Sequence, residues 1–547
     1  MTVGALSRPF GHARSLVGRL LRPRPSAGPP PIPTQTTRAI AHRYPWLRIQ
    51  RVGEVNALSP FTGSPDVGDD GQIPDIVVVD APSRGGPKDL SPSAVADGLI
   101  SCEQHAVPTV IFADAVSDAE APTTQVARMV VSSRTDVTSA AARMLGPERT
   151  MTVPELVDTG RFNPAHSNGA TTDLIVLLGH DGAIEHELQQ RLAGTATTVA
   201  VLDPRRESHP DELSELSHRA SVVILTDPSQ AAPRAHALCL ALAACGVPIV
   251  AATTTPMLDA EALTPTEGDV TNTAVALTRD QPRRHIASIR TRRAVLLRNN
   301  LDAWLDALLP ALGIPSRPST SVSLIAPLTN SALLPRLRDN VHRQQHPVLE
   351  TIVVTRARDA ALVKAHLADW EVPTRIVTVS AESGWADHLN AGSASASGEC
   401  LALLDQKALY GPFHVTDLLL ALSYSSADLV GRRERFVYDS KRNLTTRTLT
   451  GSQEQPTERV ITATALLPRE IALRFGFARR VKDADAWLAE QIRAAGGKVY
   501  ATHPFDTVLS GRVRTEVDDH LTTIGEDAAR AMPFGDGGVP VRPLPKR

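Results

Sequence analysis

Short apolar runs and amphipathic segments alternate along most of the chain, and this pattern predicts its secondary structure. An apolar run of about four to eight residues bounded by polar or turn residues is typical of a strand buried on both faces of a parallel sheet. In the first third of the chain, such runs cover 75–80, 107–114 and 128–133. Helical segments lie between them, and this alternation predicts a parallel sheet covered by helices on both faces.

The same pattern starts again after Asn168 and predicts a second sheet. Its strands are expected at 173–179, 198–203, 221–226 and 246–251, and its helices at 185–192 and 231–244. The two alternations together predict two Rossmann-like layers. A long amphipathic helix is expected over 287–309, because Pro310, Gly313 and Pro315 follow it.

A third alternation begins at Ser321 and completes the division of this α/β chain into domains. We expect a basic, partly disordered arm at 1–43, Rossmann-like domains at 44–167 and 168–286, a connecting helix and linker at 287–317, a third α/β domain at 318–515, and a partly disordered tail at 516–547. From Pro533 on, the glycines and prolines of the tail predict disorder.

Composition narrows the classes of function. The formal net charge of -2 argues against a nucleic-acid surface along the whole chain, so no nucleic-acid partner is expected. The four cysteines lack metal-ligand spacing, which predicts small buried side chains in a reducing compartment. The longest apolar stretch, 237–252, contains Gly246 and Pro248 and is shorter than the ~20 residues of a membrane span. The N-terminus has no uninterrupted apolar core of a secretory signal, so a cytoplasmic location is expected.

The first 50 residues carry eight arginines and no acidic residue. Leu6, Phe10, Val17 and Leu20 fall on one face if this segment is helical. Two interpretations stay open. The segment is a surface helix that touches anionic lipid at the inner face of a membrane, or it is a disordered basic arm followed by the proline-rich linker 23–33.

Five segments after residue 320 follow one another in an order and spacing similar to one known family. They are SVSLIAPLTN at 321–330, HPVLETIVVT at 346–355, GWADHLNAG at 384–392, GECLALLD at 398–405 and YGP at 410–412. On these motifs, residues 318–515 resemble glycosyltransferase family 2, whose fold is GT-A. The resemblance implies a nucleotide-sugar donor bound beyond the carboxyl ends of parallel strands.

The resemblance also implies where the donor would bind. The turn that contains Pro327, Thr329 and Asn330 is expected to place backbone N–H groups and side-chain amides on the base and ribose. Asn390 and Gly392 are expected to let a helix approach the ribose closely, because a larger side chain at the glycine would block the ligand. An ordinary turn is the plainer interpretation of each motif taken alone.

The family's metal-binding acidic cluster is degraded here. Relatives hold Mg²⁺ or Mn²⁺ with acidic residues at this point, but this chain reads Asp405-Gln406-Lys407-Ala408. No metal is expected unless Asp405 alone retains one. Two alternatives follow: Lys407 neutralises the diphosphate as a point charge in place of the metal, or the site is inactive.

The resemblance suggests a catalytic base near the start of a later helix. In inverting relatives an aspartate there removes the proton of the acceptor hydroxyl, and its counterpart is Asp485, with Asp483 as the alternative. The neighbouring family residues are replaced by Ala484 and Gln491. A purely structural alternative is that either aspartate caps the helix.

The first half of the chain resembles GT-B glycosyltransferases at fewer positions. Residues 242–251, LAACGVPIVA, stand where that class has a donor-binding segment, and Ala241 occupies the place of an acidic residue that holds the donor ribose. No G-x-G-x-x-G follows a predicted strand, which disfavours a Rossmann oxidoreductase.

Taken together, the sequence predicts a hexosyltransferase that moves a sugar, with inversion, from a nucleotide-sugar donor to a cell-envelope glycan or lipid-linked acceptor. Arg432, Arg433 and Arg435 are either contacts for a phosphate on that acceptor or a solvated basic edge. The alternative function is a glycosyltransferase-like scaffold or binding subunit without catalytic activity.

Overall fold

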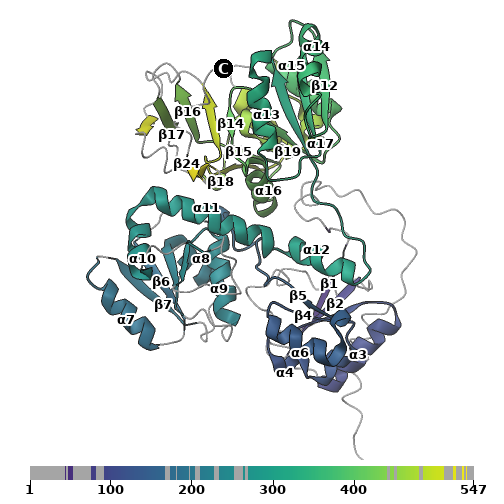
Figure 1. Cartoon of the computed structure of the whole chain (residues 1–547), viewed down its shortest axis with the longest axis vertical. Helices are drawn as coiled ribbons and strands as arrows, with labels where there is room; N and C mark the ends of the chain where they lie inside the picture. The colour runs from purple at the N-terminus through teal and green to yellow at the C-terminus, as the bar shows by residue number, and fades with distance from the viewer. Residues whose placement is uncertain are drawn as a thin grey trace, which may run out of the picture.

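A computed structural model describes the following residues of the chain: 44, 47, 49–52, 75–81, 91–166, 173–179, 182–195, 197–203, 210–226, 233–251, 263–264, 269–439, 444–448, 453–479, 484–510, 521–524, 533–534 and 537–538. The basic arm at 1–43 and Asp483 lie outside this set. The prediction of a mixed α/β protein built on parallel sheets is confirmed. Three α/β units follow one another (Figure 1).

The first unit is a five-stranded parallel sheet whose strands are arranged in their chain order. They are β1 (Ile49–Val52), β2 (Ile76–Asp80), β3 (Thr109–Phe112), β4 (Met129–Ser132) and β5 (Thr150–Thr152). Right-handed connections in this order place every crossover helix on the same face. The segments between the strands contain α3 (Pro92–Gln104), α4 (Val116–Ala119), α5 (Pro122–Val126), α6 (Thr135–Leu145) and the 3₁₀ turn η3 (Pro147–Arg149).

Alternation along β2 shows how the two faces of this sheet are covered. Val77 and Val79 pack in one core with Leu99 of α3. Ile76 and Val78, on the opposite face, pack instead with Trp304. Both faces of this sheet are therefore covered by helices, as predicted, but the crossover helices cover only one face because the strand order never reverses. A helix from much later in the chain covers the second face.

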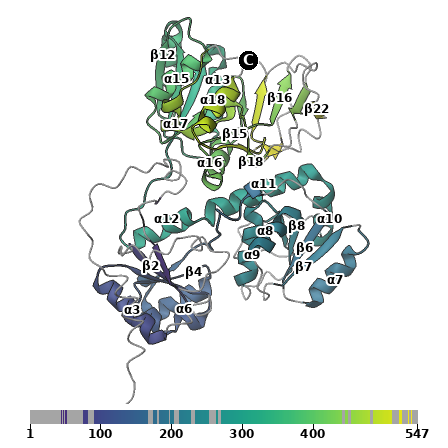
Figure 2. The same ribbon diagram turned by 180° about the vertical axis from the view of Figure 1, so that it is seen from behind.

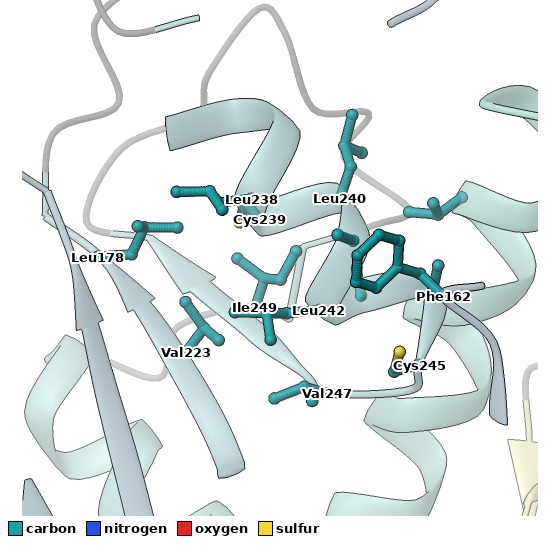
Figure 3. Close-up of a cluster of buried hydrophobic side chains, with 14 of the residues drawn as sticks. Phe162, Leu178, Val223, Leu238, Cys239, Leu240, Leu242, Cys245, Val247 and Ile249 are labelled. Atoms are coloured by element: carbon teal, nitrogen blue, oxygen red, sulfur yellow. The ribbon is translucent and has the colours of Figure 1, made fainter. Parts of the chain in front are cut away.

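The second unit is a four-stranded parallel sheet in which the strand order does reverse. The order is β7 (Thr198–Leu202), β6 (Leu174–Leu178), β8 (Ala220–Leu225) and β9 (Ile249–Ala251). Its helices are α7 (Gly182–Leu192), α8 (Pro210–Arg219), α9 (Pro233–Ala244) and α10 (Val270–Arg279), and η4 (Pro164–His166) precedes the sheet. Alternating strand residues belong to two separate cores, one of which is drawn in Figure 3. Both faces are thus covered, as expected for a Rossmann-like layer.

Two helices join the second unit to the third. They are α11 (Gln281–Arg298) and α12 (Leu301–Ala311), and they run below the C-terminal unit and above the two N-terminal ones (Figure 2). The prediction of one helix over 287–309 is wrong. The Asp280 carboxylate caps α11 by accepting from the Arg283 N–H at 3.0 Å, and Asn300 caps α12 by accepting from the Ala303 N–H at 2.7 Å. The Asp280 cap starts α11 before residue 287, and the Asn300 cap starts a second helix. The predicted single helix is therefore two helices.

The third unit contains an eight-stranded mixed sheet. Its order is β12 (Thr374–Val379), β11 (Glu350–Arg356), β10 (Val322–Leu328), β13 (Cys400–Leu403), β19 (Leu466–Pro468), β15 (Leu429–Arg432), β20 (Val499–Thr502) and β18 (Gln455–Pro456). The helical elements of this unit are η5 (Ser331–Leu333), α13 (Leu334–His342), η6 (Ala357–Asp359), α14 (Ala360–Leu367), α15 (Trp385–Ser395), α16 (His414–Ser425), η7 (Thr462–Thr464), α17 (Arg469–Phe475) and α18 (Ala484–Ala494).

A smaller sheet lies beside it and includes part of the predicted tail. Its order is β14 (Leu409–Tyr410), β21 (Thr507–Ser510), β16 (Arg435–Asp439), β17 (Leu444–Thr448) and β22 (Leu521–Ile524). Further on, β23 (Pro533–Phe534) pairs with β24 (Gly537–Gly538), so the expectation of disorder from Pro533 is wrong for these residues. Backbone pairing orders these short segments although their composition is typical of disorder.

Buried ions connect α11 to the third unit. Arg293 forms two hydrogen bonds to the Asp417 carboxylate, at 2.7 and 2.8 Å, and Arg292 lies 2.7 Å from Glu454. The His503 Nε2 is 3.1 Å from Asp417 Oδ2. We call these five residues the interdomain ion cluster. Each is less than a tenth exposed, so the charges of the two arginines and the two carboxylates depend on their partners.

We expect the protein to lose stability as the pH falls from 7 to 5. Burial lowers the pKa of His503 to about 4, from an ordinary value of 6.5. Between these two values the unfolded chain binds a proton that the folded chain does not, so acid favours unfolding. The free energy of unfolding should drop by about 2 kcal/mol from this group. Urea denaturation at both pH values measures the drop; an equal drop in His503→Gln would contradict the assignment.

The four cysteines, at 102, 239, 245 and 400, are buried thiols, as predicted. None of the helices in the described part of the chain combines the length and the apolarity that crossing a bilayer requires.

Candidate functional site

The order of strands in the large sheet reverses between β10 and β13. β10 is the first strand of the sheet in the chain; β11 and β12 extend it on one side, and β13 pairs with it in parallel on the other. Ligands of open α/β sheets bind at the carboxyl ends of the strands where such a reversal occurs. Here β10 ends at Leu328 and leads into Thr329 and Asn330, while β13 ends at Leu403 and leads into Asp405. We call this place the switch point.

One side chain that sequence reasoning did not select, Gln406, bridges the switch point. Its Oε1 accepts hydrogen bonds from the backbone N–H groups of Thr329 at 3.0 Å and Asn330 at 3.1 Å. Its Nε2 donates to the Thr329 hydroxyl at 2.6 Å. The N–H groups expected to contact a base and ribose therefore already have a partner. The signal available in the sequence was the position of Gln406, which immediately follows the aspartate that ends the strand motif.

Asp405 and Lys407 lie in one turn. The Asp405 Oδ1 accepts from the Lys407 N–H at 2.8 Å, and the Ala408 N–H donates to the Asp405 carbonyl at 3.0 Å. Arg336 of α13 donates to the Lys407 carbonyl at 3.0 Å. The Lys407 side chain is exposed, so its ammonium is accessible to a ligand at this edge.

The residues at this turn do not fit the metal that the family resemblance implies. A divalent cation in such a site needs carboxylate oxygens, and the turn supplies one carboxylate followed by a lysine. Gln406, between them, points its amide at the β10 turn instead. Among the described residues, no three His, Cys, Asp or Glu side chains are grouped so that they could hold a metal ion.

A buried tyrosine connects this turn to the segment that precedes β19. The Asp405 N–H donates to the Tyr410 hydroxyl at 2.7 Å, and that hydroxyl donates to the Ala463 carbonyl at 2.6 Å. Burial, with the charge of Asp405 as a smaller cause, raises the pKa of Tyr410 above its ordinary range, so it stays a neutral donor. Ala463 belongs to η7, which therefore lies against the switch point.

Asp485 reaches the same segment from α18. Its Oδ1 accepts from the Thr462 N–H at 2.9 Å, next to Ala463. Asp485 lies in the first turn of α18, and this bond runs to η7 and not to the backbone of its own helix. Asp485 is thus joined to η7 directly, and Asp405 is joined to the same segment through Tyr410.

Asn390 and Gly392 take part in helix packing. The Asn390 side chain donates to the Phe477 carbonyl and accepts from the Phe477 N–H, both at 2.8 Å, so both ends of its amide are used. A Cβ on Gly392 would lie 2.6 Å from Ile325 Cγ2 and 3.0 Å from Val354 Cγ2. The glycine thus allows α15 to approach the sheet, and this contact differs from the ligand contact that the sequence predicts.

Other predicted positions are buried in the fold. Pro327 is buried within β10 and pairs in register with Val354. Arg432 is 1% exposed, donates to the Phe505 carbonyl at 2.8 Å, and lies 2.7 Å from His414 Nδ1. Neither alternative predicted for Arg432, a phosphate contact or a solvated edge, is correct.

The GT-B-like segment of the second unit is also part of a core. Ala241 is fully buried on α9 (Figure 3 shows its neighbours Leu240 and Leu242), so no residue at this position could reach a ribose without a rearrangement of the helix. Gly246 has a φ of 92° in the turn before β9, a conformation that favours glycine. This turn leads into the amino end of β9, whereas ligands bind at the carboxyl ends.

No protein-family model matches the sequence, and no match to a curated protein is found. Solved structures with partial similarity include a mannosyltransferase from Pyrobaculum calidifontis in complex with GDP-Man and Mn²⁺, at 21% identity and a TM-score of 0.27, over 36% of this chain and 58% of that one. TarS of S. aureus with UDP-GlcNAc matches at 12% identity and a TM-score of 0.28, over 35% and 59% of the two chains.

GalNAc-T7 with UDP, GalNAc and Mn²⁺ matches at 13% identity and a TM-score of 0.30, over 36% of this chain and 44% of that one. This chain therefore spans 44% to 59% of the length of these three glycosyltransferases. At these scores the likenesses assign no activity, substrate or metal to it.

Proposed function

We propose that the third unit is a glycosyltransferase that takes its sugar from a nucleotide-sugar donor at the switch point. The observation that carries the proposal is the convergence of separate segments at this edge of the sheet. The turns after β10 and β13 are joined by Gln406, and η7 joins the Asp405 turn to Asp485. Ligands of open α/β sheets bind at a strand-order reversal, and an exposed cation and a carboxylate at this edge suit a diphosphate and an acceptor hydroxyl.

In this proposal Lys407 and Asp485 have different roles. The exposed Lys407 ammonium neutralises the diphosphate and stabilises the departing nucleoside diphosphate, in place of a metal ion. Asp485 takes the proton of the acceptor hydroxyl while its oxygen attacks the anomeric carbon, which inverts the configuration. The acceptor is a cell-envelope glycan or lipid-linked sugar, and the basic arm at 1–43 contacts the inner face of a membrane.

A second candidate function is a scaffold without transferase activity. It is favoured by a specific observation: Gln406 already satisfies the Thr329 and Asn330 N–H groups, and Phe477 already uses both ends of the Asn390 amide. Groups that are satisfied internally have less to gain from a ligand, because binding must first break these bonds. Nucleotide binding distinguishes the two candidates.

We expect the purified protein to bind a nucleoside diphosphate equally well with and without Mn²⁺, and to lose about 10- to 150-fold in affinity in Lys407→Ala. A charge-assisted contact to phosphate is worth roughly 1.5–3 kcal/mol, which corresponds to this range. Calorimetric titration with UDP, GDP, ADP and dTDP measures both effects. Lys364→Ala is the matched control, because Lys364 is an exposed lysine on α14 and its loss changes the net charge equally.

Each alternative result has a definite meaning. If none of the four nucleotides binds, the scaffold is the better description and the transferase proposal fails. If binding requires Mn²⁺ and is the same in Lys407→Ala, a metal ion holds the diphosphate and the role assigned to Lys407 is wrong.

A further inference from the structure

A cavity of about 290 Å³ lies where the second unit, α11 and the third unit meet. The second unit contributes the start of β8 and the turn before β9, α11 contributes Ser288 and Arg292, and the third unit contributes His503, Phe505 and the segment 453–455. This volume is at the lower end of the roughly 300–1,000 Å³ of typical ligand pockets. Junctions between domains are a common place for such pockets.

This interdomain cavity is separate from the switch point. None of Thr329, Asp405, Gln406 or Asp485 lines it. His503 follows β20, which is three strand spacings from β13 in the sheet, or about 14 Å at ~4.8 Å per strand. A ligand in the cavity would therefore not occupy the position of the proposed donor.

His503 supplies an unused hydrogen-bond acceptor in the cavity wall. Its Nε2 is 3.1 Å from the Asp417 carboxylate, which can only accept when ionised, so Nε2 carries the hydrogen. Because burial lowers the pKa of His503, the ring is neutral and Nδ1 is an acceptor. In the described part of the structure, neither ring nitrogen has a partner in hydrogen-bond geometry although His503 is 2% exposed, and the Asp417 carboxylate lies near Nε2 alone. A buried polar atom left without a partner costs about 1–3 kcal/mol, which a ligand that donates a hydrogen bond would recover.

The charges in the wall are already used within the protein. Arg292 is paired with Glu454, and Arg284 donates to the carbonyls of Leu277 and Thr278 at 3.1 and 2.9 Å. Glu454 also accepts from the Tyr424 hydroxyl at 2.7 Å. An ionic ligand would have to compete with these contacts, so the wall favours a neutral ligand.

The remaining wall residues are neutral hydrogen-bonding groups around aromatic rings. Phe505 stacks on His503 with ring centroids 5.7 Å apart. The other polar members are the imidazoles of His218 and His285 and a set of amides and hydroxyls, at Gln281, Gln453, Gln455, Ser217, Ser221 and Ser288. Amides and hydroxyls both donate and accept, which suits a ligand with many hydroxyl groups. Aromatic rings suit the apolar face that a sugar ring presents.

We propose that the interdomain cavity binds a neutral saccharide, with a sugar hydroxyl donating to His503 Nδ1 and the sugar ring lying against Phe505. The second unit, α11 and the third unit all line this cavity, so the site exists only when the three are assembled. The proposal does not rest on the proposed function, since it requires no activity and no nucleotide at the switch point.

The test is saturation-transfer NMR and calorimetry on the full chain with glucose, galactose, mannose and N-acetylglucosamine, and with inorganic phosphate as the ionic comparison. We expect at least one sugar to bind saturably. Ser288→Leu should weaken binding at least 10-fold by filling the cavity, and Lys407→Ala should leave it unchanged. The matched control is Ser139→Leu, the same substitution at an exposed position on α6 of the first unit, which does not line the cavity.

Two variants of His503 distinguish a loss of binding from a loss of folding. His503→Gln keeps an acceptor oxygen and should retain more affinity than His503→Phe, and thermal melts check that each variant is folded. The proposal is overturned if no sugar binds, if folded Ser288→Leu binds as the unchanged protein does, or if Lys407→Ala abolishes sugar binding. Binding of phosphate alone would overturn it too, because the cavity would then be an anion site.

Discussion

Asp485→Asn should lower the rate of sugar transfer by about 10²- to 10⁴-fold while leaving donor affinity within about twofold, since a general base contributes rate enhancement of this size. Asparagine keeps an oxygen that can accept from the Thr462 N–H, so the 2.9 Å hydrogen bond to η7 can persist while the base is lost. Release of nucleoside diphosphate from a panel of nucleotide sugars measures turnover, and calorimetry measures donor affinity.

Two further variants separate the chemical role of Asp485 from its structural role. Asp485→Ala removes both the base and the hydrogen bond, so it should lower the melting temperature as well as the rate. Glu490→Gln removes one negative charge from an exposed position on the same helix and should change neither. Unchanged turnover in Asp485→Asn would exclude Asp485 as the base and leave it as a residue that positions η7.

Arg293→Ala should destabilise the third unit by about 3–5 kcal/mol, the usual cost of removing one partner of a buried ion pair. The substitution leaves the Asp417 carboxylate buried without its two strongest hydrogen bonds. Asp506, whose Oδ2 is 3.6 Å from Arg293, is also buried, so the remaining charges repel each other. The packing of the guanidinium over the Phe413 ring, 3.7 Å away, is lost too. Urea denaturation followed by circular dichroism measures the change.

Arg290→Ala is the matched control, because Arg290 is exposed on the same helix. The paired replacement Arg293→Met with Asp417→Leu should recover much of the loss, since apolar groups of similar size often replace a buried pair at little cost. A loss below about 1 kcal/mol in Arg293→Ala would mean that water reaches Asp417 and that the cluster is not sealed by α11.

Strand positions could be predicted because they depend on local patterns. Runs such as 173–179 and 221–226 are short and apolar between polar or turn residues, and they correspond to β6 and β8. Which helix covers the second face of the first sheet could not be predicted in this way. Trp304 and Leu308 follow the second sheet in sequence, and nothing near them indicates that they pack on Ile76 and Val78. Contacts between distant segments leave no periodic signal in either one.

The candidate site was predictable where residue order fixes position. Asp405 and Thr329 follow strands β13 and β10, and the carboxyl ends of parallel neighbours share one edge. The partners of these residues were not predictable. The bond from Gln406 to the β10 turn spans 77 residues, and the bond from Asn390 to Phe477 spans 87. In the sequence, the lack of a side chain at Gly392 suggested that a ligand lies against it. In the structure, Ile325 and Val354 occupy that space, so packing alone requires a glycine there.

The packing of α12 on the first sheet also affects the order in which the chain can fold during synthesis. Domains generally fold as they emerge from the ribosome, beginning with the N-terminal one. The first sheet, complete in its strands at Thr152, receives the helix over its second face only when Leu301–Ala311 has emerged. The second unit lies entirely between these two points. The second unit can therefore fold while the apolar residues on the second face of the first sheet, such as Ile76 and Val78, are still uncovered.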